Sequence, residues 1–285
     1  PGRGPGAMTH ALAETLRKDG IDLIYLRLGG AYRNPFIGSL STLPRLKFPP
    51  RLSLQFDDFG NPDLPADCPQ TARALRRLMA GSHSVSAVSR AVRDRVRRYW
   101  PAEPRRIHVV GNGVDLRRFG RRKKQRTSGP KPYILSIGRQ ARYKGMDLLI
   151  FAFAQIADQF AVDLVIAGPD AGKDYLHVLI RKLGLEKRVQ FPGFTEHREL
   201  PALLRDAEFF ALASRWDSFG IAALEAMAAG VAVIAPRVGG FVDYIEDGKT
   251  GRLFSPGDPG DLASAMRRLL LRPAEARSLG AAARE

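Results

Sequence analysis

The sequence is poor in the features that mark disulfide-bonded, membrane-spanning and secreted proteins. It has one cysteine in 285 residues, Cys68, which excludes an intrachain disulfide framework and is compatible with a reducing compartment. It contains no run of about 20 apolar residues, which excludes a transmembrane helix. No signal peptide is recognisable, and the chain opens PGRGPGAM rather than with methionine. We therefore expect a fragment, in which a missing targeting segment means little.

Several binding motifs are also missing. The sequence has neither a Walker A loop nor a GxGxxG pattern, which disfavours dinucleotide binding of the usual kind. No RNP, zinc-finger or basic-zipper pattern is present, so nucleic acid is not an expected partner. The histidines match no metal-ligand spacing, so we expect no metal site and expect surface or loop positions for His10, His83, His108, His177 and His197.

Positive charge is abundant but uneven. The chain has a formal net charge of +16, and residues 1–128 carry 25 Lys and Arg against 10 Asp and Glu, whereas residues 129–285 carry 20 against 19. Such a basic half could face nucleic acid, an anionic membrane or an acidic ligand, or could be an Arg-rich surface exposed to solvent. The charge alone names no partner. Its densest segments are 90–100, 104–107 and 117–126.

From residue 132 onward, short apolar runs alternate with segments of helical spacing. This alternation predicts a parallel sheet covered by helices on both faces, as in a Rossmann-like domain. Ligands of such sheets bind at the carboxyl ends of the strands, where the loops meet helix N-termini. We expect strands at 132–138, 162–169, 189–194, 208–214, 231–236 and 251–256, and helices at 146–160, 174–185, 199–207 and 219–229.

The first part of the chain is also α/β, with too few units to close a full domain. We therefore divide the chain into a partial N-terminal domain over 1–116, a basic linker over 117–131 and a C-terminal domain over 132–285. In the first part we expect helices at 8–20, 71–81 and 89–100, the last with Ser89 as N-cap, and strands at 21–29 and 84–89. We also expect a strand followed by a loop at 51–60 and a strand followed by a turn at 106–115.

The stretch RWDSFGIAALEAMAAG (215–230) sets a carboxylate on either side of a helix start. Ser218 is the predicted N-cap, and Gly230 suits the left-handed position after the helix. Asp217 and Glu225 would lie about 10–12 Å apart along the axis, which is about the reach of a sugar diphosphate plus ribose. The free amides at the helix start favour an anion between them. The alternative is a capped core helix in which Asp217 complements the helix dipole.

A second stretch of interest, SIGRQARYKGMD (136–147), follows the first strand of the C-terminal domain. Arg139 and Lys144 lie on its loop at the ligand edge, and Gly138 and Gly145 allow close backbone approach. Two cations on such a loop suit a diphosphate. The alternative is a pair of solvated surface cations.

Taken together, these stretches resemble glycosyltransferase family 4 from about residue 84 to the end. GRQARYKG (138–145) resembles the family's GR-x4-KG loop, and SRWDSFGIAALEAMAAGVAVIAPRVGG (214–240) resembles its E-x7-E segment. YIEDGKTGRLFSPGD (244–258) resembles the tail that follows, and IHVVGNGVDLRRF (107–119) the stretch that closes the first domain. The ordered combination is specific. From this resemblance we expect a chain that starts inside the family's first domain and stops before its C-terminal helix.

The resemblance implies a GT-B fold, with two Rossmann-like domains whose parallel sheets face across a cleft, the first of them incomplete. It implies a retaining glycosyltransferase that moves a sugar from a nucleotide-diphosphate donor to a hydroxyl acceptor without a metal or other cofactor. Residues 1–116 would serve the acceptor and 132–285 the donor. The leaving phosphate itself would deprotonate the acceptor hydroxyl, so that no protein nucleophile is needed.

The resemblance also implies a role for each site residue. Glu225 would hold the ribose hydroxyls and Asp217 would face the donor sugar, while Arg139 and Lys144 would neutralise charge as the diphosphate leaves. At the helix start, with Ser218, the amides of Phe219, Gly220 and Ile221 would lie beside the diphosphate. The loop around Gly193 and Phe194 would flank the base, and Gly138 is a further donor-binding position.

Three positions depart from the family pattern. Asp217 stands where the first acid is usually Glu, which keeps the charge and shortens the reach, and Asp243 likewise replaces a usual Glu. Many members have a histidine at the end of a first-domain strand, where this sequence has Asp57 or Asp58. Neither can be assigned a catalytic role from the sequence.

Two other functions compete with sugar transfer. A nucleotide-sugar epimerase shares the GT-B architecture, but the GR-x4-KG loop and the paired acids argue against it. A non-catalytic GT-B-like protein could instead dock nucleic acid or a membrane through its basic half. For the leading hypothesis we expect a nucleotide sugar and a carbohydrate or glycolipid acceptor as partners. We expect a cytoplasmic location, or a peripheral one on the inner face of an anionic membrane.

Overall fold

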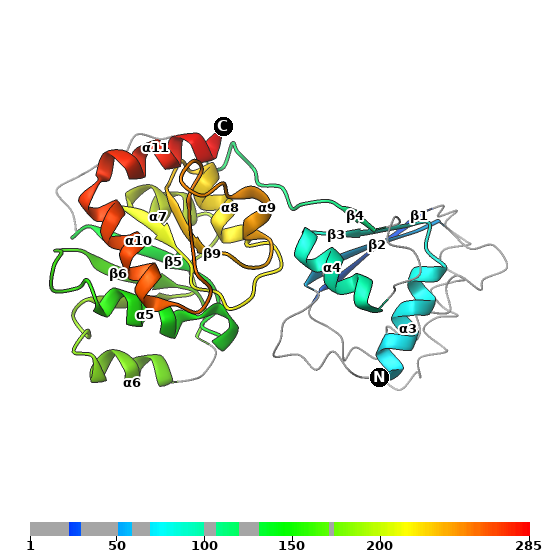
Figure 1. Cartoon of the computed structure of the whole chain (residues 1–285), viewed down its shortest axis with the longest axis horizontal. Helices are drawn as coiled ribbons and strands as arrows, with labels where there is room; N and C mark the ends of the chain where they lie inside the picture. The colour runs from blue at the N-terminus through cyan, green and yellow to red at the C-terminus, as the bar shows by residue number, and fades with distance from the viewer. Residues whose placement is uncertain (1–22, 30–50, 59–68, 100–106, 120–130, 171–173) are drawn as a thin grey trace. The chain divides into compact units, whose positions relative to one another are not determined.

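The computed structural model describes residues 23–29, 51–58, 69–99, 107–119, 131–170 and 174–285 (Figure 1). The chain divides between Asn112 and Gly113 into two compact units. Each unit carries its own parallel sheet, in agreement with the α/β pattern of the sequence. The helix expected over 8–20 lies outside the described residues.

The described part of the first unit is a parallel sheet with strand order β1-β2-β3-β4. Strands expected from the sequence match all four, and Asp57 and Asp58 form the carboxyl end of β2. The elements are β1 (Leu23–Gly29), β2 (Arg51–Asp58), α3 (Pro69–Ala80), β3 (Ser84–Ala87), α4 (Arg90–Tyr99) and β4 (Ile107–Val109).

Helix α4 shows how local chemistry sets these elements. Its predicted N-cap is confirmed, because the backbone N–H of Val92 donates to the Ser89 hydroxyl at 3.1 Å. Val92 and Val96, four residues apart, are fully buried, while Arg93 and Arg95 flank this stripe and are partly exposed, and Arg90 and Arg98 are exposed. The helix therefore packs through an apolar stripe and turns its basic face outward.

The second unit is a parallel sheet with strand order β10-β9-β8-β5-β6-β7. The chain starts at the central strand β5, builds outward to β7, and then returns to build β8, β9 and β10 on the other side. The strands are β5 (Tyr133–Ile137), β6 (Asp163–Ala167), β7 (Val189–Gly193), β8 (Phe209–Ala211), β9 (Val233–Pro236) and β10 (Arg252–Phe254). The helices are η3 (Arg142–Lys144), α5 (Met146–Ala154), α6 (Tyr175–Lys182), α7 (Leu200–Asp206), α8 (Ile221–Ala228), α9 (Phe241–Tyr244), α10 (Pro259–Leu271) and α11 (Pro273–Arg284).

This order places a topological switch point between β5 and β8. Connections leave the two strands in opposite directions there, which opens a crevice at their carboxyl ends where ligands of such sheets bind. The loop after β5 holds the GR-x4-KG residues, and the loop after β8 holds the paired-acid segment. The fold therefore brings the two stretches singled out in the sequence to one place.

Two apolar layers cover the sheet. Side chains alternate along each strand, so that Ile134 faces one layer and Leu135 the other. The first layer is built mainly by α5, α6 and α10, and the second by α7, α8 and α9. The inner strands β6, β8 and β9 and the middle of β5 are buried on both faces, which explains why they read as continuous apolar runs, whereas the edge strands β7 and β10 are partly exposed.

The predicted linker begins too early. Phe119, expected inside the linker 117–131, is 1% exposed and packs in the second apolar layer. The guanidinium of Arg284 donates to the Phe119 carbonyl at 3.0 Å and also to the carbonyl of Ala228. Residues 113–119 thus belong to the second unit, and residues 120–130 lie outside the described part of the chain.

The C-terminal helices are a further difference. The sequence analysis assigned no helices to α10 and α11, although α10 carries a clear start signal. The Asp258 carboxylate accepts from the amides of Gly260 and Asp261 at 2.8 and 3.0 Å, and Pro259 occupies the first turn. The helix expected over 146–160 is shorter than predicted, because α5 ends at Ala154 and turns follow.

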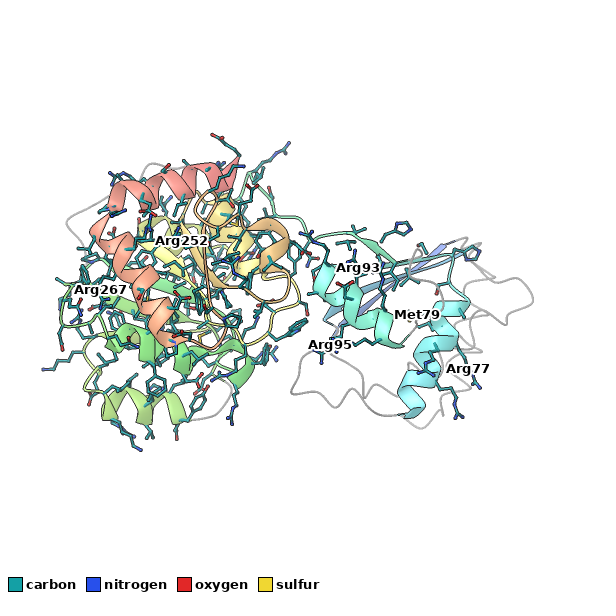
Figure 2. All side chains as sticks on the ribbon, in the orientation of Figure 1. Arg77, Met79, Arg93, Arg95, Arg252 and Arg267 are labelled. Carbon is teal, nitrogen blue, oxygen red and sulfur yellow. The ribbon has the colours of Figure 1, made fainter. Side chains whose placement is uncertain are left out.

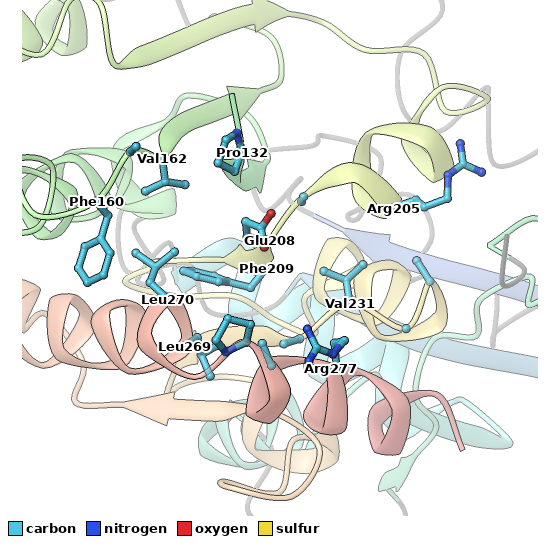
Figure 3. A pocket seen from close by; sticks show the side chains of 17 residues that line it. Pro132, Phe160, Val162, Arg205, Glu208, Phe209, Val231, Leu269, Leu270 and Arg277 are labelled. Carbon is cyan, nitrogen blue, oxygen red and sulfur yellow. The ribbon is translucent and has the colours of Figure 1, made fainter. Parts of the chain in front are cut away.

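In the residues that the structure describes, no helix is long and apolar enough to cross a membrane. A pocket of about 1020 Å³ lies at the amino ends of β5, β6, β8 and β9, between these strands and the α10–α11 corner (Figure 3). It is at the opposite edge of the sheet from the switch point. It is lined by residues that include Pro132, Val162, Arg205, Glu208, Val231 and Arg277.

Candidate active site

The loop after β5 is held close to its neighbours by backbone contacts. The amide of Gly138 donates to the carbonyl of Ala167 on β6 at 2.9 Å. Gly145 has φ +64°, and a Cβ there would lie 1.9 Å from the carbonyl oxygen of Ala213, which follows β8. Only glycine therefore allows this loop to lie against the β8 loop. Gly145 therefore permits a close approach, as expected. At Gly138 the structure does not require glycine, because a Cβ there would lie at an ordinary contact distance of 3.4 Å from the Met146 methyl.

The two predicted cations of this loop have different surroundings. The Arg139 side chain is exposed and forms no hydrogen bond or ion pair with the described residues, while its backbone carbonyl accepts from the Ala141 amide at 2.7 Å. Lys144, in the short turn η3, places its Nζ 2.7 Å from Oδ2 of Asp217. The side chains of Lys144 and Asp217 are 22% and 12% exposed, so the pair is largely shielded from water. Lys144 and Asp217, 73 positions apart, thus meet at the switch point.

The predicted N-cap of helix α8 is wrong. Ser218 is buried two positions before the actual N-cap, which is Gly220, with φ +89° and no side-chain cap. The reason is the packing around this turn: a Cβ at Gly220 would lie 2.1 Å from the Phe241 ring. The hydroxyl of Tyr244 donates toward the carbonyls of Phe219 and Gly220, at 2.9 and 3.0 Å. The turn is thus held by α9 rather than by a serine cap.

Helix α8 otherwise ends as predicted, because Gly230 follows its last turn with φ +74°. At its start, the amides of Gly220 and Ile221 form no hydrogen bond with the described residues. The amide of Phe219 donates to Oδ1 of Asp217 at 3.4 Å. Two free amides therefore lie beside the Lys144–Asp217 pair, and the Ile221 side chain is 48% exposed above them.

Tyr244 has an altered acidity at this turn. Burial raises the pKa of the Tyr244 hydroxyl well above its ordinary value, and the carboxylates of Asp217 and Asp243 act in the same direction. The hydroxyl therefore remains a hydrogen-bond donor at physiological pH. Asp243, which stands where the family usually has Glu, lies on α9 and contributes through this charge.

Glu225 is buried, 7% exposed, on α8. Its Oε1 lies 2.7 Å from Nε2 of His197, whose side chain is 50% exposed. The sequence analysis expected His197 to be a surface or loop residue; it does lie in a loop, between β7 and α7, yet it contacts a predicted site residue. The available signal was its place in PGFTEH, one of the loops at the carboxyl edge of the sheet.

Gly193 is the last residue of β7, and Phe194 opens the loop after it, the loop that carries His197. Gly193 has φ +78°, and its carbonyl accepts from the amide of Gly168 at 2.8 Å. Phe194 is 74% exposed, which is unusual for a large apolar side chain. Both residues lie at the carboxyl end of β7, the same sheet edge as the rest of the site.

An ion pair that was not predicted from the sequence joins the loop after β8 to the first turn of α5. Arg215 binds Asp147 through two parallel hydrogen bonds of 2.8 and 2.7 Å, and it also donates to the carbonyl of Arg142 at 2.8 Å. Burial alone would raise the pKa of Asp147, but the hydrogen bond and charge of Arg215 hold it below its ordinary value. Burial raises the pKa of the neighbouring Tyr175 hydroxyl, which has no hydrogen-bond partner among the described residues.

Two further points from the sequence concern Asp57 and Asp58 and a possible metal site. The side chains of Asp57 and Asp58 lie outside the described residues, so their predicted position is tested only for the backbone. Within the described part of the chain, no cluster of three His, Cys, Asp or Glu side chains could hold a metal ion.

Comparison with known families identifies this arrangement. Residues 118–285 match the model described as "Glycosyl transferases group 1", and residues 69–118 match "Glycosyltransferase Family 4". The chain belongs to the group 1 glycosyl transferases. The family predicted from the GR-x4-KG loop and the paired acids is therefore confirmed. The two parallel α/β units of the structure also agree with the predicted fold.

Curated relatives of this group 1 glycosyl transferase carry several names. It is 32% identical over 261 residues to D-inositol 3-phosphate glycosyltransferase 2 of Catenulispora acidiphila, covering 84% of this chain and 58% of the relative. It is 32% identical over 209 residues to glycogen synthase of Mycobacterium tuberculosis, covering 73% of this chain and 50% of the relative. The chain thus spans about half the length of these relatives.

Solved structures share the fold of this group 1 glycosyl transferase. Anabaena Alr3699/HepE in complex with UDP-glucose matches with a TM-score of 0.81 at 23% identity, over 99% of this chain and 78% of that one. Sucrose-phosphate synthase from Thermosynechococcus elongatus matches with a TM-score of 0.81 at 24% identity, over 97% of this chain and 71% of that one. These likenesses establish the GT-B glycosyltransferase fold.

Proposed function

We propose that the protein is a retaining glycosyltransferase that moves a sugar from a nucleotide-diphosphate donor to a hydroxyl acceptor without a metal. The observation that carries the proposal is the cluster at the β5–β8 switch point. There Lys144 contacts Asp217 at 2.7 Å, and the free amides of Gly220 and Ile221 follow Asp217 in the chain. Arg139 comes from the same loop as Lys144, and Glu225 from the helix that follows Asp217. Family membership and the name of a related fold bound to UDP-glucose support the same donor class.

The diphosphate binds between Arg139, Lys144 and the amides of Gly220 and Ile221. Arg139 is unpaired among the described residues, and the amides have no acceptor, so all of these groups favour an anion. In the absence of the donor, Lys144 is neutralised by Asp217. To bind the diphosphate, Lys144 must therefore either leave Asp217 for the phosphate oxygens or contact both at once.

The remaining residues act on the sugar and the nucleoside. Asp217, next to Lys144, faces the donor sugar, and Glu225 holds the ribose hydroxyls. Gly193, at the end of β7, and Phe194, which follows it, flank the base. As the bond between sugar and phosphate breaks, the negative charge that develops on the leaving diphosphate is stabilised by groups already in place. The leaving phosphate takes the acceptor proton, and the sugar is transferred on the same face.

For the acceptor we propose an anionic or membrane-embedded molecule, such as a lipid-linked saccharide, used at the cytoplasmic face of a membrane. The basis is the basic half of the chain, whose arginines project from α3 and α4, including Arg77 and Arg95 (Figure 2). A donor diphosphate carries few charges and already has Arg139 and Lys144. The surplus of cations is therefore available for another anionic partner.

A transfer assay tests the proposal. The chain is incubated with a panel of nucleotide sugars, with and without candidate acceptors, and release of free nucleoside diphosphate is measured. Release that requires an added acceptor supports transfer. The competing function is a non-catalytic protein that docks an anionic partner through its basic half; salt-dependent binding to DNA or anionic lipid with no affinity for any nucleotide sugar would support that function instead.

A further inference from the structure

The function proposed above uses Glu225 but gives no role to His197, which contacts it. Glu225 is the more buried partner: its side chain is 9% exposed against 50% for His197. The two residues come from different elements, the β7–α7 loop and helix α8, and they are 28 positions apart. Their contact at 2.7 Å is therefore a tertiary interaction that ties a loop to a buried carboxylate.

The chemistry of the pair assigns its proton. An ionised carboxylate only accepts hydrogen bonds, so Nε2 of His197 must carry the hydrogen and donate it to Oε1 of Glu225. The other oxygen, Oε2, has no hydrogen-bond partner among the described residues. One oxygen of Glu225 is thus occupied by the protein, and the second remains available to an external donor.

The imidazole is itself held in place. The ring of the buried Phe119 packs edge-on against it, with the ring centroids 5.7 Å apart and the planes at 74°. Phe119 is in turn fixed through its carbonyl, which accepts from Arg284 at 3.0 Å. Although half of His197 faces solvent, its orientation toward Glu225 is set by a residue from the second apolar layer.

We propose that His197 is a positioning residue for the nucleoside of the donor: it fixes the Glu225 carboxylate so that Oε2 meets the ribose hydroxyls. This inference rests on the function proposed above. The vicinal hydroxyls of a ribose are donors that an ionised carboxylate can accept. A carboxylate left free to rotate on its side chain would lose orientation, and the selectivity for a ribose with both hydroxyls would fall with it.

The test compares nucleotides that differ only in these hydroxyls. ADP, GDP, CDP and UDP are first titrated by calorimetry into the unaltered chain to find the nucleotide that binds best. The affinity of that nucleotide is then divided by that of its 2′,3′-dideoxy analogue to give a ribose ratio. The ratio is measured for the unaltered chain, His197→Phe, His197→Gln, Glu225→Gln and the double variant His197→Phe/Glu225→Gln.

We expect His197→Phe to lower the ribose ratio about three- to tenfold, which is the factor that one hydrogen bond contributes. His197→Gln, which keeps a side-chain N–H, should restore part of the ratio. Adding His197→Phe to Glu225→Gln should lower the ratio little further, because both changes act through one carboxylate. The matched control is His177→Phe, which alters an exposed histidine that stacks on Phe191 at 4.9 Å; it should leave the ratio unchanged.

Two failures are distinguishable. If the unaltered chain binds none of the four nucleotides, the proposed function fails and takes this inference with it. If the unaltered chain binds and discriminates the dideoxy analogue, but His197→Phe has the same ribose ratio, the inference alone is overturned. A ratio that stays constant while the melting temperature falls would show that His197 is only a structural residue.

Discussion

Nζ of Lys144 lies 2.7 Å from Oδ2 of Asp217, and the two residues come from loops that follow different strands of the sheet. Both side chains are mostly buried, so the pair is screened little by salt. A cation and an acid with separate proposed partners, the diphosphate and the sugar, therefore neutralise one another before the donor arrives. Donor binding must rearrange this pair.

We predict that Asp217→Asn strengthens the binding of a free nucleoside diphosphate while it abolishes sugar transfer. The amide removes the negative charge that holds Lys144 and that repels the phosphates, yet it still accepts from the Phe219 amide. Releasing one partly buried cation should increase affinity about fivefold, or about 1 kcal/mol. Calorimetry with the nucleotide gives the answer; weaker binding in the variant would mean that Lys144 does not serve the diphosphate.

Arg139→Ala should weaken nucleoside-diphosphate binding more than the loss of an ordinary surface charge. Arg139 is exposed and unpaired among the described residues, so its whole charge is available, and a charge-assisted contact contributes about 1.5–3 kcal/mol. The matched control is Arg181→Ala, which removes an exposed arginine from the last turn of α6. Equal affinities for the two variants, measured by the same titration, would remove Arg139 from the site.

The Arg215–Asp147 pair should make part of the stability depend on pH. Because the folded pKa of Asp147 is held below its ordinary 3.8, the pair stabilises the fold above that value, and the contribution is lost as pH falls through the lower folded pKa. Arg215→Gln should therefore lower the free energy of unfolding at neutral pH and converge with the unaltered chain in acid. Urea unfolding at several pH values checks this; a difference that does not vary with pH would contradict it.

The sequence predicted the local elements of the fold but not the long-range contacts of the site. Strand positions followed from continuous apolar runs, and the Ser89 cap from its place before an amphipathic helix, because both signals are local. The contacts of Lys144 with Asp217, of Arg215 with Asp147 and of His197 with Glu225 join residues 28 to 73 positions apart. Only the strand order brings them together, and periodicity does not specify that order.

The wrong N-cap at Ser218 has a similar cause. A serine before an apolar run is the usual start signal, but the turn here is decided by α9, which packs against Gly220 from more than 20 positions away. The residues just before α9 pack against the same turn, since a Cβ at Gly239 would lie 1.7 Å from the Asp217 carbonyl. Tertiary packing overrode the local preference.

Gly220→Ala should test that packing. The added methyl would meet the Phe241 ring at 2.1 Å, and φ of +89° disfavours any side chain. We expect a loss of about 2–4 kcal/mol in the free energy of unfolding. Gly184→Ala is the matched control, because Gly184 has φ +67° and nothing within 4 Å of the new Cβ; it should cost about 1 kcal/mol. Equal costs would show that only the backbone conformation matters and that the contact with α9 relaxes.

The basic half should bind anionic membranes. Residues 1–128 have 15 more basic than acidic residues, and each Lys or Arg near an anionic surface contributes about 1 kcal/mol. Cosedimentation with phosphatidylcholine vesicles should therefore rise as phosphatidylglycerol is added and fall steeply with salt, since the attraction decays over about 8 Å at physiological ionic strength. Binding to neutral vesicles should be weak.

Two triple variants show whether vesicle binding depends on a specific basic face or only on the net charge of the chain. Replacing the exposed arginines Arg73, Arg77 and Arg98 of α3 and α4 by glutamine should lower the affinity for anionic vesicles more than tenfold. Replacing Arg181, Arg272 and Arg277, which are exposed in the second unit, removes the same charge and should have a smaller effect. If both triple variants lose affinity equally, binding follows net charge and no basic face exists. If the unaltered chain partitions equally onto neutral and anionic vesicles, or onto neither, the arginines of the first unit are solvated surface, and the acceptor must be sought among neutral soluble molecules.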